Sequence, residues 1–269
     1  MADGGLFEAL YGNPPPPYSP RLIGFVDILG WTALTRDPKE TDLALVENGL
    51  AALKWTEEME QQRRGDFEER AFPWGTSIRR TNFSDCTVFS CSPLFYEAWW
   101  LTRRIRYECE GLLHAGHYTR GAIALGNVRH DEGTVYGPGL IEAIHLERSV
   151  AVYPRIVVTD SAAQILAVQR PSPDSDEGWS PLVQDADGLS FLELFRRERD
   201  GTRLPLIKES AAQIREMVVG DLTRTRDASQ KPYSDQCVAL NHRAKFSWML
   251  RYVDGVLADP TMTVPEPKK

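Results

Sequence analysis

The chain has 269 residues, of which 42% are hydrophobic and 26% are charged, as is typical of a soluble globular protein. Its 31 basic and 38 acidic residues give a net charge of −7, which excludes a general nucleic-acid coat protein because such binding needs clustered Lys and Arg. The chain contains no apolar run long enough to span a membrane, and its first residues lack the pattern of a signal peptide. We therefore expect a cytoplasmic protein that binds neither nucleic acid nor a membrane.

The elements expected up to residue 160 alternate between short apolar strands and amphipathic helices. A run of four prolines makes residues 1–19 an extended leader before them. The first six elements follow the order β-α-β-β-α-β of a ferredoxin-like split βαβ, in which helices cover one face of an antiparallel sheet. The sequence thus predicts an α+β core over residues 20–160. In chain order we expect a strand at 22–26, a helix at 41–62, a hairpin of strands at 77–83 and 86–91, a helix opened by Pro93, a strand at 118–128, a helix opened by Pro138 and a strand at 156–159.

Residues 161–258 follow a different pattern, which predicts a hairpin and helices added to the core. The composition of residues 171–178 is that of a loop, and no catalytic motif is recognisable in this part of the chain. Residues 259–269 should form a frayed tail. The expected elements are a hairpin of strands at 182–184 and 189–195, followed by helices at 206–222 and 234–256.

A carboxylate follows the first predicted strand, at a turn that leads into a helix. Asp27 ends the strand, and Gly30 marks the turn. Such a turn offers free backbone N–H groups and the positive end of a helix dipole to an anion such as phosphate. Because a carboxylate beside a phosphate is repelled by it, a divalent cation is expected between them.

A second carboxylate, Asp85, lies at the tip of the predicted hairpin. If that hairpin neighbours the first strand, Asp27 and Asp85 converge on one edge of the sheet. Two carboxylates together with a backbone carbonyl suit Mg²⁺ or Mn²⁺ bound to substrate phosphates. Each aspartate alone could instead cap a helix or serve a turn, so the interpretation depends on the two occurring together.

Several segments, taken together, resemble the class III nucleotidyl cyclases. Residues 25–32, Phe-Val-Asp-Ile-Leu-Gly-Trp-Thr, are similar to the first metal-binding segment of that family, aromatic-x-Asp-Ile-x-Gly-Phe-Thr. Ser84-Asp85 resembles the Gly-Asp hairpin that supplies the second metal ligand, while residues 120–128 and 135–137 are similar to the strands that follow. The resemblance implies a catalytic domain over residues 20–160. It also implies a homodimer in which each active site takes metal ligands from one chain and base contacts from the other.

The chain departs from the family where purine cyclases read the base. The Lys that reads a purine falls on Thr81 and its partner Asp falls on Thr134, so hydroxyl groups replace two ionic groups. The Asn and Arg that position the ribose and stabilise the transition state fall on Ile141 and His145. Residues 137–147 are instead similar to a helix of the bacterial pyrimidine cyclases of Pycsar antiphage defence. Those enzymes make cyclic CMP or cyclic UMP, which activates a separately encoded effector.

The resemblance implies that UTP or CTP is converted to the 3′,5′-cyclic monophosphate and pyrophosphate by two-metal catalysis. The two divalent ions, Mn²⁺ or Mg²⁺, would be held by Asp27, Asp85 and the backbone of Ile28. Arg148 lies on the same helix face as His145 and is the candidate for the missing transition-state cation, with a solvated surface arginine as the alternative. The backbone N–H groups expected to contact the triphosphate belong to Ile28, Leu29, Gly30, Trp31 and Thr32.

The choice of base is expected to depend on Thr81, Thr134 and Arg79. Arg79 shares strand parity with Thr81 and could donate a hydrogen bond to O4 of uracil, whereas the amino group of cytosine would repel it; it could equally be an exposed strand arginine without contact to a base. We therefore expect UTP rather than CTP. Two other functions stay open at this point: a purine cyclase with unusual base contacts, and a catalytically inactive cyclase-like module that binds nucleotide. Both metal-ligand aspartates are present, which argues against the inactive module.

Overall fold

The structure is a computed structural model that describes residues 18–36, 38–68, 77–131, 133–168, 181–195, 204–227 and 233–258. Within these ranges the strands are β1 (Ser19–Ile28), β2 (Arg79–Phe83), β3 (Cys86–Cys91), β4 (Thr119–Asp131), β5 (Thr134–Tyr136), β6 (Ile156–Val158), β7 (Leu182–Gln184) and β8 (Ser190–Leu192). The helices are α2 (Trp31–Arg36), α3 (Glu40–Glu68), α4 (Phe95–His114), α5 (Pro138–Ser149), α6 (Asp160–Val168), α7 (Leu204–Asp227) and α8 (Tyr233–Ala258).

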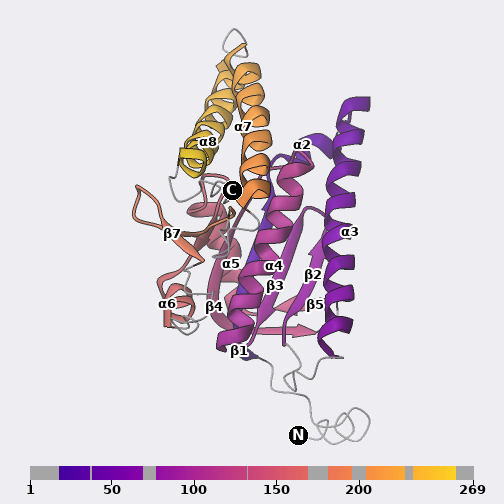
Figure 1. The fold of residues 1–269 in the computed structure, drawn as a ribbon, viewed down its shortest axis with the longest axis vertical. Helices are drawn as coiled ribbons and strands as arrows, with labels where there is room; N and C mark the ends of the chain where they lie inside the picture. The colour runs from indigo at the N-terminus through magenta and orange to yellow at the C-terminus, as the bar shows by residue number, and fades with distance from the viewer. Residues whose placement is uncertain are drawn as a thin grey trace, which may run out of the picture.

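The described strands form one sheet in the order β2-β3-β1-β4-β6-β8-β7, with β5 paired to the end of β4. Strand β1 lies between β3 and β4 and is antiparallel to both. The order β2-β3-β1-β4 is that of a ferredoxin-like core, so the α+β prediction is confirmed. The hairpin β7–β8 extends the same sheet, because β8 pairs with β6. Figure 1 shows the sheet behind α4, with α7 and α8 side by side beyond one end of it.

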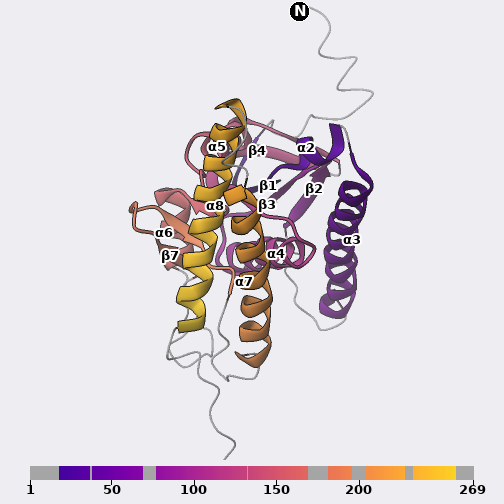
Figure 2. The ribbon, with the colours of Figure 1, turned by 90° about the horizontal axis from the view of Figure 1, so that it is seen from above.

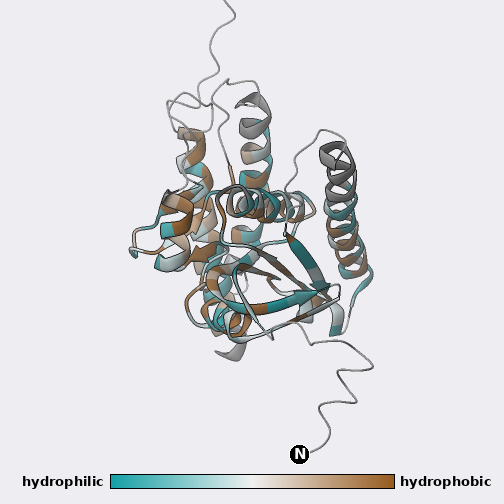
Figure 3. Ribbon diagram, turned by 90° about the horizontal axis from the view of Figure 1, so that it is seen from below, coloured by the Kyte–Doolittle hydropathy of each residue, from teal (hydrophilic) through white to brown (hydrophobic). Residues whose placement is uncertain are grey.

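Alternate residues of β1 face opposite sides of the sheet and account for its two hydrophobic layers. Leu22 and Val26 pack with the apolar face of α4, which includes Leu101 and Ile105. Successive turns of α4 bring these apolar residues onto one side, as the sequence pattern predicts. Helix α3 lies against α4 and is longer than expected. Figure 3 shows that α3 carries both hydrophilic and hydrophobic residues along its length. Some of its apolar side chains, such as that of Trp55, are exposed.

Helix α5 departs from the expected arrangement of helices on a single face. It packs on the face of the sheet opposite α4, where Ala143 meets Ile23 and Phe25 of β1. The close approach depends on two glycines, since a β-carbon on Gly139 would lie 3.0 Å from the Gly126 Cα and 2.8 Å from the Ile23 Cδ1. The side of the sheet that carries Asp27 is therefore partly covered by a helix.

The other differences concern element ends and one short helix. Helix α6 is not predicted from the sequence, because its nine residues are too few for a clear periodic pattern. The two C-terminal helices and the β7–β8 hairpin are confirmed. The predicted loop at 171–178 and tail at 259–269 lie outside the described residues, as does most of the leader, although Ser19 already belongs to β1. None of the helices within the described ranges is long and apolar enough to cross a membrane.

The close approach of Gly139 to Gly126 predicts that a larger residue at position 139 destabilises the packing of α5 on the sheet. Alanine is favoured over glycine by about 1 kcal/mol within a helix, so Gly220→Ala in α7, where a β-carbon meets nothing closer than 4.0 Å, should raise the free energy of unfolding. Gly139→Ala should lower it instead, because the added carbon has no room. Urea unfolding of both variants measures the difference. Equal effects of the two substitutions would contradict the packing of α5 on β4.

Candidate active site

Asp27 and Asp85 lie at the same edge of the sheet, as the sequence predicts. Asp27 is near the end of β1, where it pairs with Cys86 of β3 on one side and with Arg120 of β4 on the other. Asp85 precedes Cys86 in the β2–β3 turn, and its backbone carbonyl accepts a hydrogen bond of 2.9 Å from the N–H of Ile28. Main-chain pairing thus fixes the tip of the hairpin beside the end of β1.

Two charged side chains that the sequence analysis did not select complete the cluster around Asp27. The Arg120 Nε lies 3.7 Å from the Asp27 Oδ2 and forms a closer ion pair with Glu147 of α5. Glu147 is only 2% exposed. The register of β1 against β4 would have identified Arg120, since it stands opposite Asp27 in the strand pair. No comparable signal exists for Glu147, whose direction depends on how α5 packs.

The Asp27 carboxyl lies where negative charge is poorly compensated. Burial raises its pKa to about 6, and the neighbouring Glu147 carboxylate adds to this rise. Arg120 acts in the opposite direction, Asp85 again raises the pKa, and Arg148 lowers it. A divalent cation bound between the carboxylates would remove this excess of negative charge.

The side chains present fit a metal ion that is shared with substrate phosphates. Within the described residues, no group of three or more His, Cys, Asp or Glu side chains is arranged to hold a metal ion. Asp27 and Asp85 therefore offer two carboxylates rather than a complete cage. Magnesium is commonly bound in this way, by one or two carboxylates plus the oxygens of a phosphorylated substrate and water.

Of the five backbone N–H groups predicted to contact the triphosphate, two already donate to other backbone groups of the protein. The N–H groups of Ile28 and Leu29 already donate to backbone carbonyls of neighbouring elements, at 2.9 and 2.8 Å. The prediction that these two N–H groups contact the triphosphate is therefore wrong, because pairing with the rest of the core uses them. In the part of the chain described, no acceptor takes up the N–H groups of Gly30, Trp31 and Thr32. Gly30 has a φ of 83°, which makes the sharp turn into α2 possible.

Arg148 and Thr134 are both exposed. Arg148 follows Glu147 on α5, and its charge reaches Asp27, as its effect on the Asp27 pKa shows. Thr134 begins β5, opposite Asp131 in the β4–β5 pair. Ile141 and His145 are also exposed on α5. They occupy the positions at which the class III cyclases, in the resemblance described above, carry Asn and Arg.

Thr81 forms a hydrogen bond that the sequence analysis did not anticipate. Its Oγ1 lies 2.9 Å from the Nε2 of His130, whose Nδ1 lies 2.8 Å from the Ser90 Oγ. Burial lowers the pKa of His130 to about 4, with a further contribution from the positive charges of Arg21 and Arg79, so the ring is neutral near pH 7. Thr81 is therefore held by an uncharged partner. The Arg79 side chain lies on the same face of β2 and is exposed.

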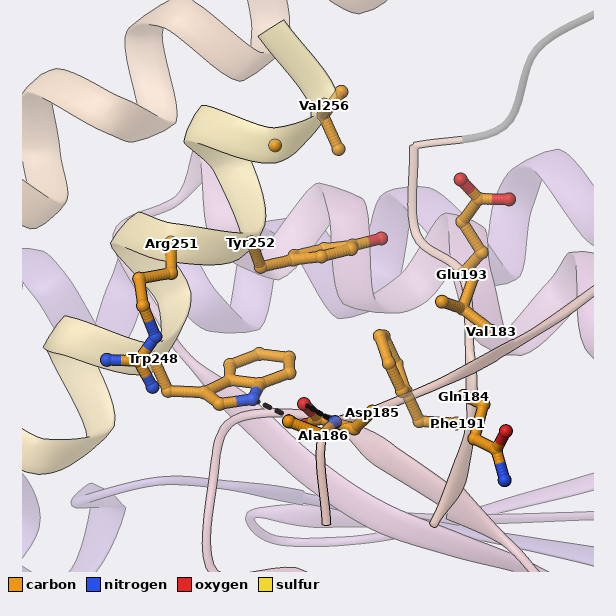
Figure 4. A pocket seen from close by; sticks show the side chains of 11 residues that line it. Val183, Gln184, Asp185, Ala186, Phe191, Glu193, Trp248, Arg251, Tyr252 and Val256 are labelled. Atoms are coloured by element: carbon orange, nitrogen blue, oxygen red, sulfur yellow. Dashed lines mark hydrogen bonds between the residues drawn. The ribbon is translucent and has the colours of Figure 1, made fainter. Parts of the chain in front are cut away.

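A separate pocket of about 480 Å³ lies between the β7–β8 hairpin and α8 (Figure 4). Phe191 and Tyr252 form part of its wall, and the Trp248 Nε1 donates a hydrogen bond of 2.6 Å to Asp185. None of the residues selected from the sequence lines this pocket. It is thus distinct from the cluster around Asp27.

Comparison with known proteins finds a likeness among solved structures. The chain is similar to an adenylate/guanylate cyclase/hydrolase from Silicibacter pomeroyi, with 17% sequence identity and a TM-score of 0.35, over 66% of this chain and 96% of that chain. No family model and no curated protein matches the chain. The fold assignment therefore rests on the strand order and register of this chain itself.

The raised pKa of Asp27 predicts a pH-dependent gain in stability for Asp27→Asn. A carboxyl whose pKa is about 6 in the folded protein and about 3.8 in the unfolded chain stabilises the fold fully only at low pH, and this contribution is lost as the pH rises through 6. The substitution should therefore raise the free energy of unfolding by about 1–3 kcal/mol at pH 7.5 in metal-free buffer. Urea unfolding at pH 7.5 and 4.5 provides the measurement, with a clearly smaller gain expected at the lower pH, where the folded carboxyl is protonated but the unfolded one is already mostly ionised. A variant no more stable than the wild type at pH 7.5 would contradict the prediction.

Proposed function

We propose that this protein is a pyrimidine nucleotide cyclase, which converts UTP, or alternatively CTP, to the 3′,5′-cyclic monophosphate and pyrophosphate. The observation that supports this most directly is the meeting of Asp27 and Asp85 at one edge of the sheet, beside the N–H groups of the Gly30 turn. Carboxylates hold divalent cations, and free N–H groups bind phosphate oxygens. Both requirements of a metal-bound triphosphate are met at one place.

The chemistry assigned to the site is attack of the ribose 3′-oxygen on the α-phosphorus. Two bound divalent ions, Mg²⁺ or Mn²⁺, held by Asp27, Asp85 and the backbone of Ile28, would lower the pKa of the 3′-hydroxyl and neutralise the triphosphate. The N–H groups of Gly30, Trp31 and Thr32 orient the phosphates. In this proposal, Arg148 supplies positive charge to the phosphoryl oxygens as pyrophosphate leaves.

Hydroxyl and guanidinium groups support the choice of a pyrimidine base. Thr81, bound to a neutral His130, and Thr134 provide no ionic pair for a purine edge. A threonine hydroxyl can donate one hydrogen bond and accept others, which suits the carbonyl groups of a pyrimidine. The Arg79 guanidinium can only donate, so it favours the O4 carbonyl of uracil over the amino group of cytosine.

We propose that two copies of the chain share these sites. The base-contact residues Thr81 and Thr134 would serve the Asp27 site of the partner copy, as in the head-to-tail arrangement implied by the resemblance. Large apolar side chains are exposed near these residues, among them Phe83, Tyr136 and Ile141. Burial of such side chains would favour association. The cyclic product would act on a separate effector in antiphage defence, in the cytoplasm.

The Arg120–Asp27 ion pair favours a second candidate function. A guanidinium 3.7 Å from Asp27 gives this carboxylate a positive partner without a metal ion, as expected of an inactive module that binds nucleotide for regulation. The two functions differ in turnover. An active cyclase releases pyrophosphate together with cyclic nucleotide, whereas an inactive module binds the triphosphate unchanged.

A competition assay tests the proposed activity and its base. The purified chain is incubated with equal concentrations of UTP, CTP, ATP and GTP and with Mn²⁺ or Mg²⁺, and the products are identified by mass. We expect cyclic UMP as the main product, because hydrogen-bonding groups left unpaired by the wrong base cost several kcal/mol. Asp85→Asn should abolish turnover and retain the fold, since it removes a charged ligand at nearly constant volume.

Each outcome of this assay has a distinct meaning. Cyclic CMP would overturn only the choice of uracil, and cyclic AMP or cyclic GMP would overturn the pyrimidine assignment. Triphosphate binding without product would favour the regulatory module. Full activity of Asp85→Asn would contradict the assignment of the metal site.

Shared sites predict complementation between two inactive variants. Asp27→Asn removes a metal ligand, and Thr134→Arg places a bulky cation at an exposed base-contact position. In a heterodimer one site carries both changes and the other carries neither. An equal mixture should recover about a quarter of the wild-type activity, because half of the dimers are mixed and each has one intact site. Absence of activity in heterodimers whose formation has been verified would rule out shared sites.

A further inference from the structure

Helix α8 brings a lysine to the cluster around Asp27. Lys245 is half-buried, and burial lowers the pKa of its ammonium group. The charges that act on it are those of Arg120, which lowers the pKa further, and of Asp27 and Glu147, which raise it. All three belong to the candidate active site. Within the described residues Lys245 forms neither a hydrogen bond nor an ion pair, so its ammonium group is available to a ligand.

Packing of α8 against the start of β4 places Lys245 there. The ring of Phe246, the next residue, lies 5.0 Å from that of Tyr118. The Tyr118 hydroxyl donates a hydrogen bond of 2.7 Å to Asp221 of α7, which ties the second helix to the same point. Figure 2 shows α7 and α8 side by side, with α8 extending toward α5.

The same tyrosine links α8 to the predicted phosphate-binding turn. The backbone carbonyl of Tyr118 accepts the N–H of Leu29, the residue immediately before Gly30. Along the helix, Lys245 lies three and four residues before Trp248 and Met249, which are both buried, so it belongs to the side of α8 that faces the core. The exposed Arg243, two residues earlier, lies on a different side.

We infer that Lys245 binds the triphosphate of the substrate, so that the C-terminal helix completes the active site of its own chain. The inference rests on the proposed function in so far as a metal-bound triphosphate occupies the Asp27 site. The phosphates add negative charge at a place where Arg120 is already engaged by Glu147 and Asp27. An ammonium group is a compact donor that suits phosphate oxygens.

Binding of inorganic tripolyphosphate tests the inference without requiring turnover. Full-length wild type, Lys245→Met, Lys245→Arg and Arg243→Met are titrated with tripolyphosphate in Mg²⁺ buffer by calorimetry. Lys245→Met keeps the length of the side chain and removes the charge, and it should weaken binding at least tenfold. Lys245→Arg should restore most of the affinity. Arg243→Met removes a charge from the same helix outside the site and should bind as the wild type does.

Three results would overturn the inference: unchanged binding by Lys245→Met, an equal loss in Arg243→Met, or no binding by the wild type. The first would show that Lys245 only balances the charges of Asp27 and Glu147. Thermal unfolding of Lys245→Met distinguishes a folded variant from an unfolded one, and Lys245→Gln, which also removes the charge, replaces it in the comparison if the Met variant unfolds. Turnover of the four nucleoside triphosphates by the wild type is measured separately. A protein that binds tripolyphosphate through Lys245 but makes no cyclic nucleotide would contradict the proposed function and leave this inference standing.

Discussion

Several elements of the structure meet at one carboxylate, Asp27, at the end of the central strand β1. Its burial is unfavourable for the ionised form, and the nearby carboxylates of Glu147 and Asp85 increase this cost. Positive charge reaches it from Arg120 of β4 and Arg148 of α5. A buried charge is tolerated only where such partners, or a cation, are present. Three other segments of the chain, the β2–β3 turn, β4 and α5, therefore contribute to the environment of this one side chain.

Backbone pairing explains how these segments meet. The β1 strand is hydrogen-bonded on both sides, so the register against β3 and β4 sets the positions of Asp85 and Arg120 relative to Asp27. Helix α5 can then reach Arg120 with Glu147 because Gly126 and Gly139 allow the helix to approach the sheet closely. A small shift of α5 would therefore change the charge balance at the site as well as the packing.

The C-terminal hairpin and helices are attached directly to the sheet that carries Asp27. The β7–β8 hairpin continues the sheet, and α7 and α8 meet the start of β4 at Tyr118. Such an attachment gives the added helices access to the end of the sheet where the carboxylates lie. The sequence offered no catalytic motif in this region because a lysine on a long helix is indistinguishable from a surface residue until the helix has been placed.

The sequence by itself determined the strands, the long helices and the two carboxylates. Strand periodicity placed Asp27 at the end of a buried run, and the hairpin pattern placed Asp85 at a turn, so local signals were sufficient for both. Only the tertiary structure decided which charges accompany them. Arg120 depends on strand register and Glu147 on the face against which α5 packs. The N–H groups of Ile28 and Leu29 were wrongly assigned to phosphate because their acceptors come from distant parts of the chain, and no local pattern records such contacts.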